Sequence, residues 1–184
     1  VRPSVQRLLD SMVGAAAYVR NHRLDVIASN ELGRALYSPA FAQAEREGWA
    51  QPNLFRFTFL DESSREFYRE WDRLASDCVA MLRIEVGRSP HDRALGALVG
   101  DLSINSSDFA AMWASHRVVA LKAGIKQYHH PQVGDLDLTY DSVELAADPG
   151  LRMSVFTVEP ATVSADNFAL LATWAATTRR EGQL

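Results

Sequence analysis

The spacing of apolar residues changes twice from a helical period to a strand-like period, near Ala15 and near Arg117. A helix presents one apolar face every three to four residues, whereas a half-buried strand alternates apolar and polar positions. The two changes therefore predict two groups of strands with a block of helices between them. If both groups join one sheet, the chain must return to its first strands after the helical block.

The first group of strands is predicted to be a hairpin. Segments 15–20 and 23–29 flank Asn21 and His22, and their pattern is typical of two strands joined by a tight turn. A short amphipathic helix from Pro3 is expected before the hairpin, and Asn30 is placed to cap the helix after it.

The central block contains the clearest helical pattern. Ser63 and Glu66 fit a capping box at the start of one long helix that reaches about Val86. Segment 38–53 is interpreted as a loop with at most one helical turn, because it is rich in turn residues. The apolar run 53–60 fits either a helix or a strand, and we favour a helix.

Two more helices complete this block, one over 91–102 and one capped by Ser106 or Ser107. After Arg117 the pattern predicts four strands and then a helix from Ser164. The predicted strands are 118–121, 125–130, 135–140 and 152–159.

This order predicts an α+β fold in a single domain over residues 1–184. We expect one antiparallel sheet of about five strands with helices packed on one face, which is a PAS-like layout that can enclose a pocket.

Charge and composition narrow the function. A formal net charge of −4 and a pI near 5.7 argue against a domain that binds a phosphate backbone by itself. Cys78 is the single cysteine, so no internal disulfide can form, and the lone thiol fits a reducing, cytoplasmic compartment. No apolar run is long enough to cross a bilayer. The first residue is Val1, and we expect the chain to be a fragment of a longer protein.

Motifs of common enzymes are absent from the sequence. It contains no glycine-rich phosphate loop, CxxC pair, HExxH or GxSxG. His129 and His130 are adjacent on a predicted strand and should point to opposite faces, which disfavours a shared metal ion. Asp135 and Asp137 are interpreted as solvated surface. We assign no catalytic residue, cofactor or metal.

Large aromatic and sulfur-containing side chains recur at helical spacing in the central block. Each alone is more often core than pocket, but together they suggest a lipid-holding cavity. The residues expected to line it are Phe67, Trp71, Leu74, Cys78, Phe109, Met112 and Trp113.

Arg83 and His116 are the candidate anchors for a ligand head group. An arginine can pair with a carboxylate through its planar fork, although a solvent-exposed salt bridge is an alternative for Arg83. His116 could instead cap the C-terminus of its helix.

Several blocks of the chain together resemble the MmyB-like transcription-regulator ligand-binding domain. These include VRPSVQRLLDSM, RLDVIASNELGRALY, HDRALGALVGDLSINSSDFAAMWASHRV and KQYHHPQVGDLDLTYDSVEL. The resemblance implies a PAS-like fold, an N-terminal helix-turn-helix domain of the XRE type, and a fatty acid or similar lipid as ligand. Asn30, Trp113, His116 and Arg83 match positions of the family pattern. The family commonly has His-Asp-Val where this chain has His116-Arg117-Val118.

Three hypotheses follow. The leading one is an effector-binding sensor, a homodimer that contacts DNA only through the helix-turn-helix domain and does not insert into membranes. The second is a dimerisation module without a ligand. The third is a small enzyme in which His116 works with Asp101 or Asp108 as an acid-base pair.

Overall fold

The computed structural model describes residues 1–115 and 124–181, and the side chains of the second segment up to residue 178. Its helices are α1 (Pro3–Ser11), α2 (Glu31–Leu36), α3 (Ser38–Arg46), α4 (Leu54–Leu60), α5 (Ser64–Phe67), α6 (Trp71–Arg88), α7 (Arg93–Asn105), α8 (Ser107–Ala114) and α9 (Val163–Glu181). Its strands are β1 (Ala16–Arg20), β2 (Val26–Ser29), β3 (Gly124–His130), β4 (Gly134–Glu144) and β5 (Arg152–Thr157).

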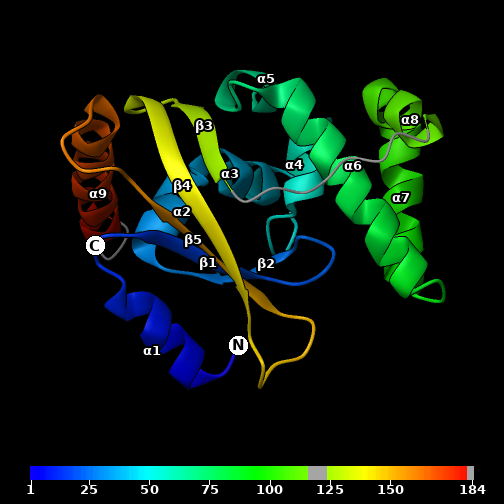
Figure 1. Cartoon of the computed structure of the whole chain (residues 1–184), viewed down its shortest axis with the longest axis horizontal. Coiled ribbons are helices and arrows are strands. Elements are labelled where there is room, and N and C mark those ends of the chain that lie inside the picture. Colours follow the sequence, from blue (N-terminus) through cyan, green and yellow to red (C-terminus); the bar gives the residue numbers. More distant parts are fainter. Residues whose placement is uncertain (116–123, 182–184) are drawn as a thin grey trace.

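The described strands form one antiparallel sheet in the order β2-β1-β5-β4-β3 (Figure 1). The N-terminal hairpin joins the C-terminal strands through β1 and β5, where Tyr18 pairs with Ser154. The prediction of an α+β fold is thereby confirmed, and so is the prediction that N-terminal and C-terminal strands join one antiparallel sheet. The predicted strand 118–121 lies outside the described residues.

The two faces of the sheet are covered unequally. On β1, Ala16 and Tyr18 belong to the main core under the helices, whereas Ala17 and Val19 contact a smaller cluster on the other face. That second cluster receives α1, which is drawn apart from the remaining helices in Figure 1. Apart from α1, the helices lie on one side, as the sequence predicts. Strand β1 therefore carries side chains to both layers, because neighbouring residues of a strand point to opposite faces.

The prediction of a loop over 38–53 is wrong in its first half, because α3 occupies Ser38–Arg46. Pro39 sits in the first turn, where a missing N–H costs nothing. Ala40 and Ala44 are buried four residues apart, so small side chains let this helix pack closely. Gly48 has a φ of +68°, a conformation that glycine adopts readily, just after the helix ends.

The single long helix predicted from Ser63 is two helices, α5 and α6. Ser63 makes no side-chain capping hydrogen bond. Between the helices, Tyr68 forms an isolated bridge with Tyr128 of β3, and the Arg69 N–H donates to the Gln127 carbonyl at 3.2 Å. The chain leaves the helix there because its backbone pairs with an edge strand of the sheet.

Other local expectations are confirmed. The Asn30 side chain accepts a hydrogen bond from the Gly33 N–H at the start of α2. Ser106 caps α8 by accepting from the Phe109 N–H at 3.2 Å. The run 53–60 forms a helix, α4, capped by Asn53. Within residues 1–115 and 124–181, no helix has the length and apolarity needed to cross a membrane.

Candidate ligand-binding site

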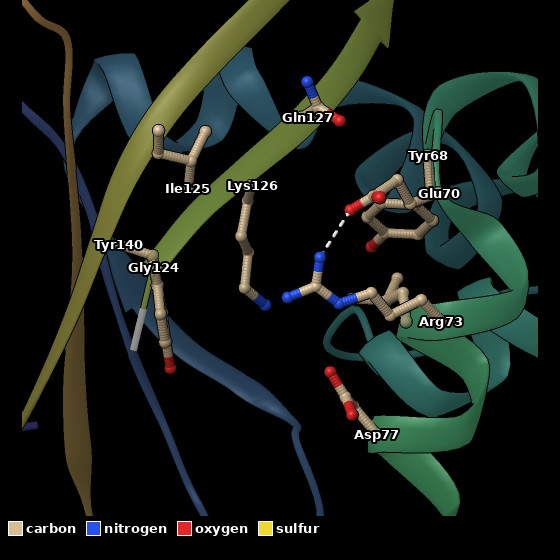
Figure 2. A pocket seen from close by; sticks show the side chains of 10 residues that line it. Tyr68, Glu70, Arg73, Asp77, Gly124, Ile125, Lys126, Gln127 and Tyr140 are labelled. Atoms are coloured by element: carbon tan, nitrogen blue, oxygen red, sulfur yellow. Dashed lines mark hydrogen bonds and ion pairs between the residues drawn. The ribbon is translucent and has the colours of Figure 1, made fainter. Parts of the chain in front are cut away.

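A groove runs between α6 and the edge of the sheet at β3 and β4 (Figure 2). Its empty volume is about 500 Å³, including the part open to solvent. One wall is the α6 side, with Leu74 and Asp77, and the other is the sheet side, with Lys126 and Tyr140. Its remaining lining residues are Tyr68, Glu70, Arg73, Gly124, Ile125 and Gln127.

A second cleft of about 380 Å³, measured in the same way, adjoins the groove. The two share Tyr68, Leu74, Lys126 and Tyr140. The inner cleft reaches between the sheet and the helices as far as β1, α4 and the junction of α2 and α3 at Tyr37. The residues found only in this inner part are Tyr18, Arg20, Leu24, Tyr37, Leu54, Thr58, Cys78 and Met81.

The periods of the elements explain this lining. On α6, Leu74, Cys78 and Met81 are spaced by four and three residues and share one face of the helix. On β1, Tyr18 and Arg20 are two residues apart and therefore point to the same side of the sheet. The cleft thus brings together one face of a helix and one face of a sheet.

Charged groups of both signs line the outer groove. The Arg73 guanidinium on α6 and the carboxylate of Glu70, the residue just before α6, are 2.9 Å apart. Figure 2 shows the side chains of Arg73 and Lys126 extending toward each other across the groove. Burial raises the pKa of Asp77 above its ordinary value, although Arg73 and Lys126 oppose this shift.

The ammonium of Lys126 lies 4.5 Å from the centre of the Tyr140 ring, a favourable distance for a cation over an aromatic face. Burial by itself would raise the pKa of Tyr140. Its hydrogen bond with Ser154 and the charges of Lys126 and Arg20 outweigh that effect, so the pKa of Tyr140 is lower than its ordinary value. Lys126 and Arg20 therefore both act electrostatically on Tyr140.

The other tyrosines near the cleft are neutral donors. The Tyr37 and Tyr128 hydroxyls are 2.9 Å apart, and burial raises the pKa values of both well above the usual range. Burial also raises the pKa of Tyr68. Hydroxyl groups that stay protonated can donate to a polar group of a ligand.

Cys78 lies at the inner cleft and is 6% exposed. Burial raises the pKa of its thiol to about 11. A thiol in this state is a poor nucleophile at neutral pH and contributes as a small apolar group.

The site residues predicted from the sequence fall in different places. Leu74 and Cys78 line the clefts. Phe67 packs within the main core against Tyr37 and Tyr128. Trp71 is also buried, and its indole N–H lies 3.1 Å from the Thr58 carbonyl. Neither Phe67 nor Trp71 lines either cleft.

The remaining aromatic candidates pack at the α8 end of α6. Phe109 stacks on Trp113 with ring centres 5.5 Å apart and contacts Phe59 at 5.0 Å. Met112 and Trp113 are partly buried against the main core. Whether a ligand contacts this region stays a prediction.

Arg83 joins α6 to α8. Its Nη2 atom donates to the carbonyls of Met112, Trp113 and Ser115 at 2.9, 2.7 and 2.8 Å. These carbonyls lie at the C-terminal end of α8, where a cation offsets the helix dipole. This Nη2 atom therefore binds backbone carbonyls and does not form the solvent-exposed salt bridge considered as the alternative. His116, the other predicted anchor, lies outside the described residues.

The two acids considered as catalytic partners of His116 form ion pairs with arginines at the surface. Asp101 pairs with Arg56 at 3.0 Å, and Asp108 pairs with Arg65. Among residues whose positions are described, no cluster of three or more metal-ligating side chains occurs. His129 is exposed and His130 is buried, so the two do point to opposite faces.

Sequence reasoning missed the cationic residues of the cleft, Arg20 and Lys126. A signal was present for Arg20, because Ala16, Tyr18 and Arg20 alternate along a predicted strand and must share its buried face. An arginine on an apolar face is unusual and often marks a polar site. Lys126 had no comparable signal, since its role depends on how closely α6 approaches β3.

The sheet and the cleft beneath its helices define an α+β ligand-binding module. The chain belongs to the MmyB-like transcription regulator ligand binding domain family, whose sequence profile matches residues 1–171. No curated protein matches the chain. The resemblance read from the sequence is therefore confirmed. The chain is a sensor domain of a transcription regulator, a class that takes a small-molecule ligand and acts with a DNA-binding domain.

Proposed function

We propose that this domain binds a fatty acid or a similar lipid-like molecule and thereby modulates DNA binding by a helix-turn-helix domain of the XRE type attached upstream. The observation that carries the proposal is the pair of adjoining clefts, which share four lining residues. Together they combine apolar walls, including Leu74 and Met81, with cationic groups. In this proposal the domain binds and releases its ligand in the cytoplasm without making or breaking a covalent bond.

The energetics of a lipid ligand suit such a site. Each buried methylene group contributes about 0.8 kcal/mol, so a ten-carbon chain can supply several kcal/mol before ordering costs. A carboxylate taken out of water needs a cation or several hydrogen bonds, or much of that gain is lost. A site with both an apolar wall and positive charge therefore selects an anionic amphiphile.

Strand β1 offers a route from the ligand to the upstream domain. Tyr18 and Arg20 line the cleft on one face, while Ala17 and Val19 contact the α1 cluster on the other. A ligand that changes the position or rigidity of β1 also acts on α1, the element nearest an upstream domain. The modulation requires different affinities of the ligand for two states of the regulator.

The test begins with the ligand. Native mass spectrometry of protein purified from a bacterial host, followed by lipid extraction, should reveal a bound amphiphile. After delipidation, titration calorimetry with decanoic acid should show binding. Cys78, the single cysteine, offers a site-specific check, because occupancy of the inner cleft should slow its alkylation by N-ethylmaleimide. Failure of both decanoic acid and 1-decanol to bind the delipidated protein would refute the lipid-sensor function.

The regulatory half of the proposal needs the regulator with its helix-turn-helix domain. Its affinity for operator DNA should differ with and without decanoic acid at a fixed salt concentration. We also propose that the regulator acts as a homodimer, which sedimentation analysis checks. An unchanged operator affinity at saturating ligand would leave a binding domain without a sensor role.

A further inference from the structure

We propose that Arg20 and Lys126 form the anion-binding end of this ligand site, and that the effector is a carboxylate whose acidic group lies between them. This inference rests on the proposed function and adds the residues that hold the acidic group of the ligand. It places the acidic group at the sheet side of the cleft, away from the α6–α8 junction that Arg83 joins.

Arg20 is a buried cation with little compensation inside the fold. It is 7% exposed, and its one described hydrogen bond, from Nη1 to the Asn21 carbonyl, is long at 3.4 Å. Among the described residues, no carboxylate lies within the 4.0 Å that defines an ion pair with Arg20. A guanidinium with five donors normally takes up several acceptors when it is buried. Arg20 lines the inner cleft, so its remaining donors are available to a ligand that binds there.

Lys126 enters the same cleft from β3, an edge strand of the sheet. Its described cation–π contact is with the Tyr140 ring at 4.5 Å, and it forms no ion pair within 4.0 Å in the described part of the chain. Figure 2 shows its ammonium end projecting into the groove rather than lying along β3. Two cations thus approach one space from β1 and β3.

The charges around the two clefts do not balance. The lining of the two clefts contains three cations and two carboxylates. The cations are Arg20, Arg73 and Lys126, and the carboxylates are Glu70 and Asp77. The Arg73 and Glu70 pair is already formed at 2.9 Å. Asp77 lies at the outer groove and is not among the residues of the inner cleft, so it does not neutralise Arg20. One additional carboxylate, supplied by a ligand, completes the set.

The chemistry favours a carboxylate with an apolar body. The planar fork of an arginine matches a carboxylate in two parallel hydrogen bonds, and a lysine adds a point charge. Next to these cations stand Leu74, Cys78 and Met81, which can cover an alkyl chain but offer no strong hydrogen bonds. A neutral alcohol of equal length would gain the apolar contacts and lose most of the electrostatic ones.

The experiment compares decanoic acid with 1-decanol by titration calorimetry on delipidated protein of residues 1–184. Arg20→Met keeps an unbranched side chain and removes the charge. It should weaken decanoic acid at least about tenfold, the usual value of a charge-assisted hydrogen bond, and change 1-decanol less than about twofold. Lys126→Met should shift the same ratio in the same direction.

Arg152→Met is the matched control. Arg152 pairs directly with Arg20 across β1 and β5, so it occupies the same face of the sheet, yet it lines neither cleft. Its removal should change both affinities less than about twofold. Arg83→Met tests the competing anchor at the α6–α8 junction and should also leave the ratio of acid to alcohol affinity unchanged.

Thermal unfolding without ligand supplies a second readout. A buried cation with one long hydrogen bond and no ion pair among the described residues costs stability, so Arg20→Met should unfold at a temperature equal to or above that of the unchanged protein. A structural role would have the opposite result, with a loss of stability larger than in Arg152→Met. That loss would overturn the proposal.

The binding outcomes separate this inference from the function on which it rests. If the unchanged protein binds decanoic acid and neither Arg20→Met nor Lys126→Met changes the acid-to-alcohol ratio, the anion-binding end lies elsewhere and the inference is wrong while the sensor function stands. If only Arg83→Met changes the acid-to-alcohol affinity ratio, the inference is likewise wrong and the sensor function stands. If neither ligand binds the unchanged protein, the lipid-sensor function itself fails.

Discussion

Replacing Asn30 by alanine tests how far one buried side chain holds three elements together. Asn30 is 5% exposed and sits between β2 and α2. Its Oδ1 atom accepts from the N–H groups of Ala17 and Gly33 at 2.9 and 2.7 Å. Its Nδ2 atom donates to the carbonyls of Met12 and Ala15 at 3.0 and 2.8 Å. One amide therefore joins the segment after α1, strand β1 and helix α2.

The size of the effect follows from these four hydrogen bonds. A typical bond contributes about 1 kcal/mol net, and Asn30→Ala leaves two donors and two acceptors without their partner. We expect a loss of about 4 kcal/mol in the free energy of unfolding. For a domain of this length, that corresponds to a fall of roughly 8–16 °C in Tm. Such a loss is a large part of the stability of an ordinary domain.

Urea denaturation followed by circular dichroism, with thermal unfolding beside it, measures the effect. Asn167→Ala is the control, because Asn167 makes one described side-chain hydrogen bond, an exposed one to the Asp135 carbonyl at 3.0 Å. It should cost less than about 1 kcal/mol. Asn30→Asp keeps the shape but turns a carboxylate oxygen toward two carbonyls, and should cost more than about 2 kcal/mol. Equal, small losses in Asn30→Ala and Asn167→Ala would refute the reasoning.

Three further predictions concern packing, pH and a helix end. A Cβ at Gly33 would lie 3.0 Å or less from backbone atoms of β1, so Gly33→Ala should lower stability by about 1–3 kcal/mol, whereas Gly96→Ala, with open space around it, should raise it by about 0.5–1 kcal/mol in the same urea titration. Burial lowers the pKa of His130 below its ordinary value, so the unfolded chain binds more protons, and the contribution of this residue to stability should be complete above about pH 6.5 and fall as the pH drops toward the folded-state pKa. Urea titrations at several pH values should show that the free energy of unfolding depends less on pH in His130→Gln, and an equal pH dependence would contradict this prediction. Arg83→Met should cost about 2 kcal/mol by thermal unfolding, because three carbonyls lose their shared cationic donor. Arg88→Met, at the exposed end of the same helix, should cost less than about 0.5 kcal/mol. Similar losses in both variants would show that the contact of Arg83 with α8 does not stabilise the fold.

Local patterns predicted the elements well where one physical signal dominated. Asn30 and Ser106 are small polar residues before apolar helical runs, and both cap helices. The same kind of reasoning was wrong at Ser63. The expected capping box required the chain to stay helical through Tyr68, but pairing of that segment with β3 interrupts the helix. A contact with a distant strand outweighed a local preference.

The candidate site was predictable only in part. Leu74 and Cys78 were chosen because they share a helix face, and that face does line the cleft. Phe67 and Trp71 met the same criterion but pack into the core, since periodicity says which face is covered and not whether a cavity or another side chain covers it. The same limit applies to Phe109, whose ring is occupied by its aromatic neighbours.

What the sequence determined by itself was the broad order of two strands, a helical block, further strands and a last helix, together with the α+β class and the family. These depend on spacing and residue type along the chain. The tertiary structure decided which side chains meet. Arg20 and Lys126 are on strands separated by the whole helical block, and only the sheet order places β1 and β3 around one space beside α6. The cleft and its charge result from the register of distant strands and the approach of a helix, quantities that no local period encodes.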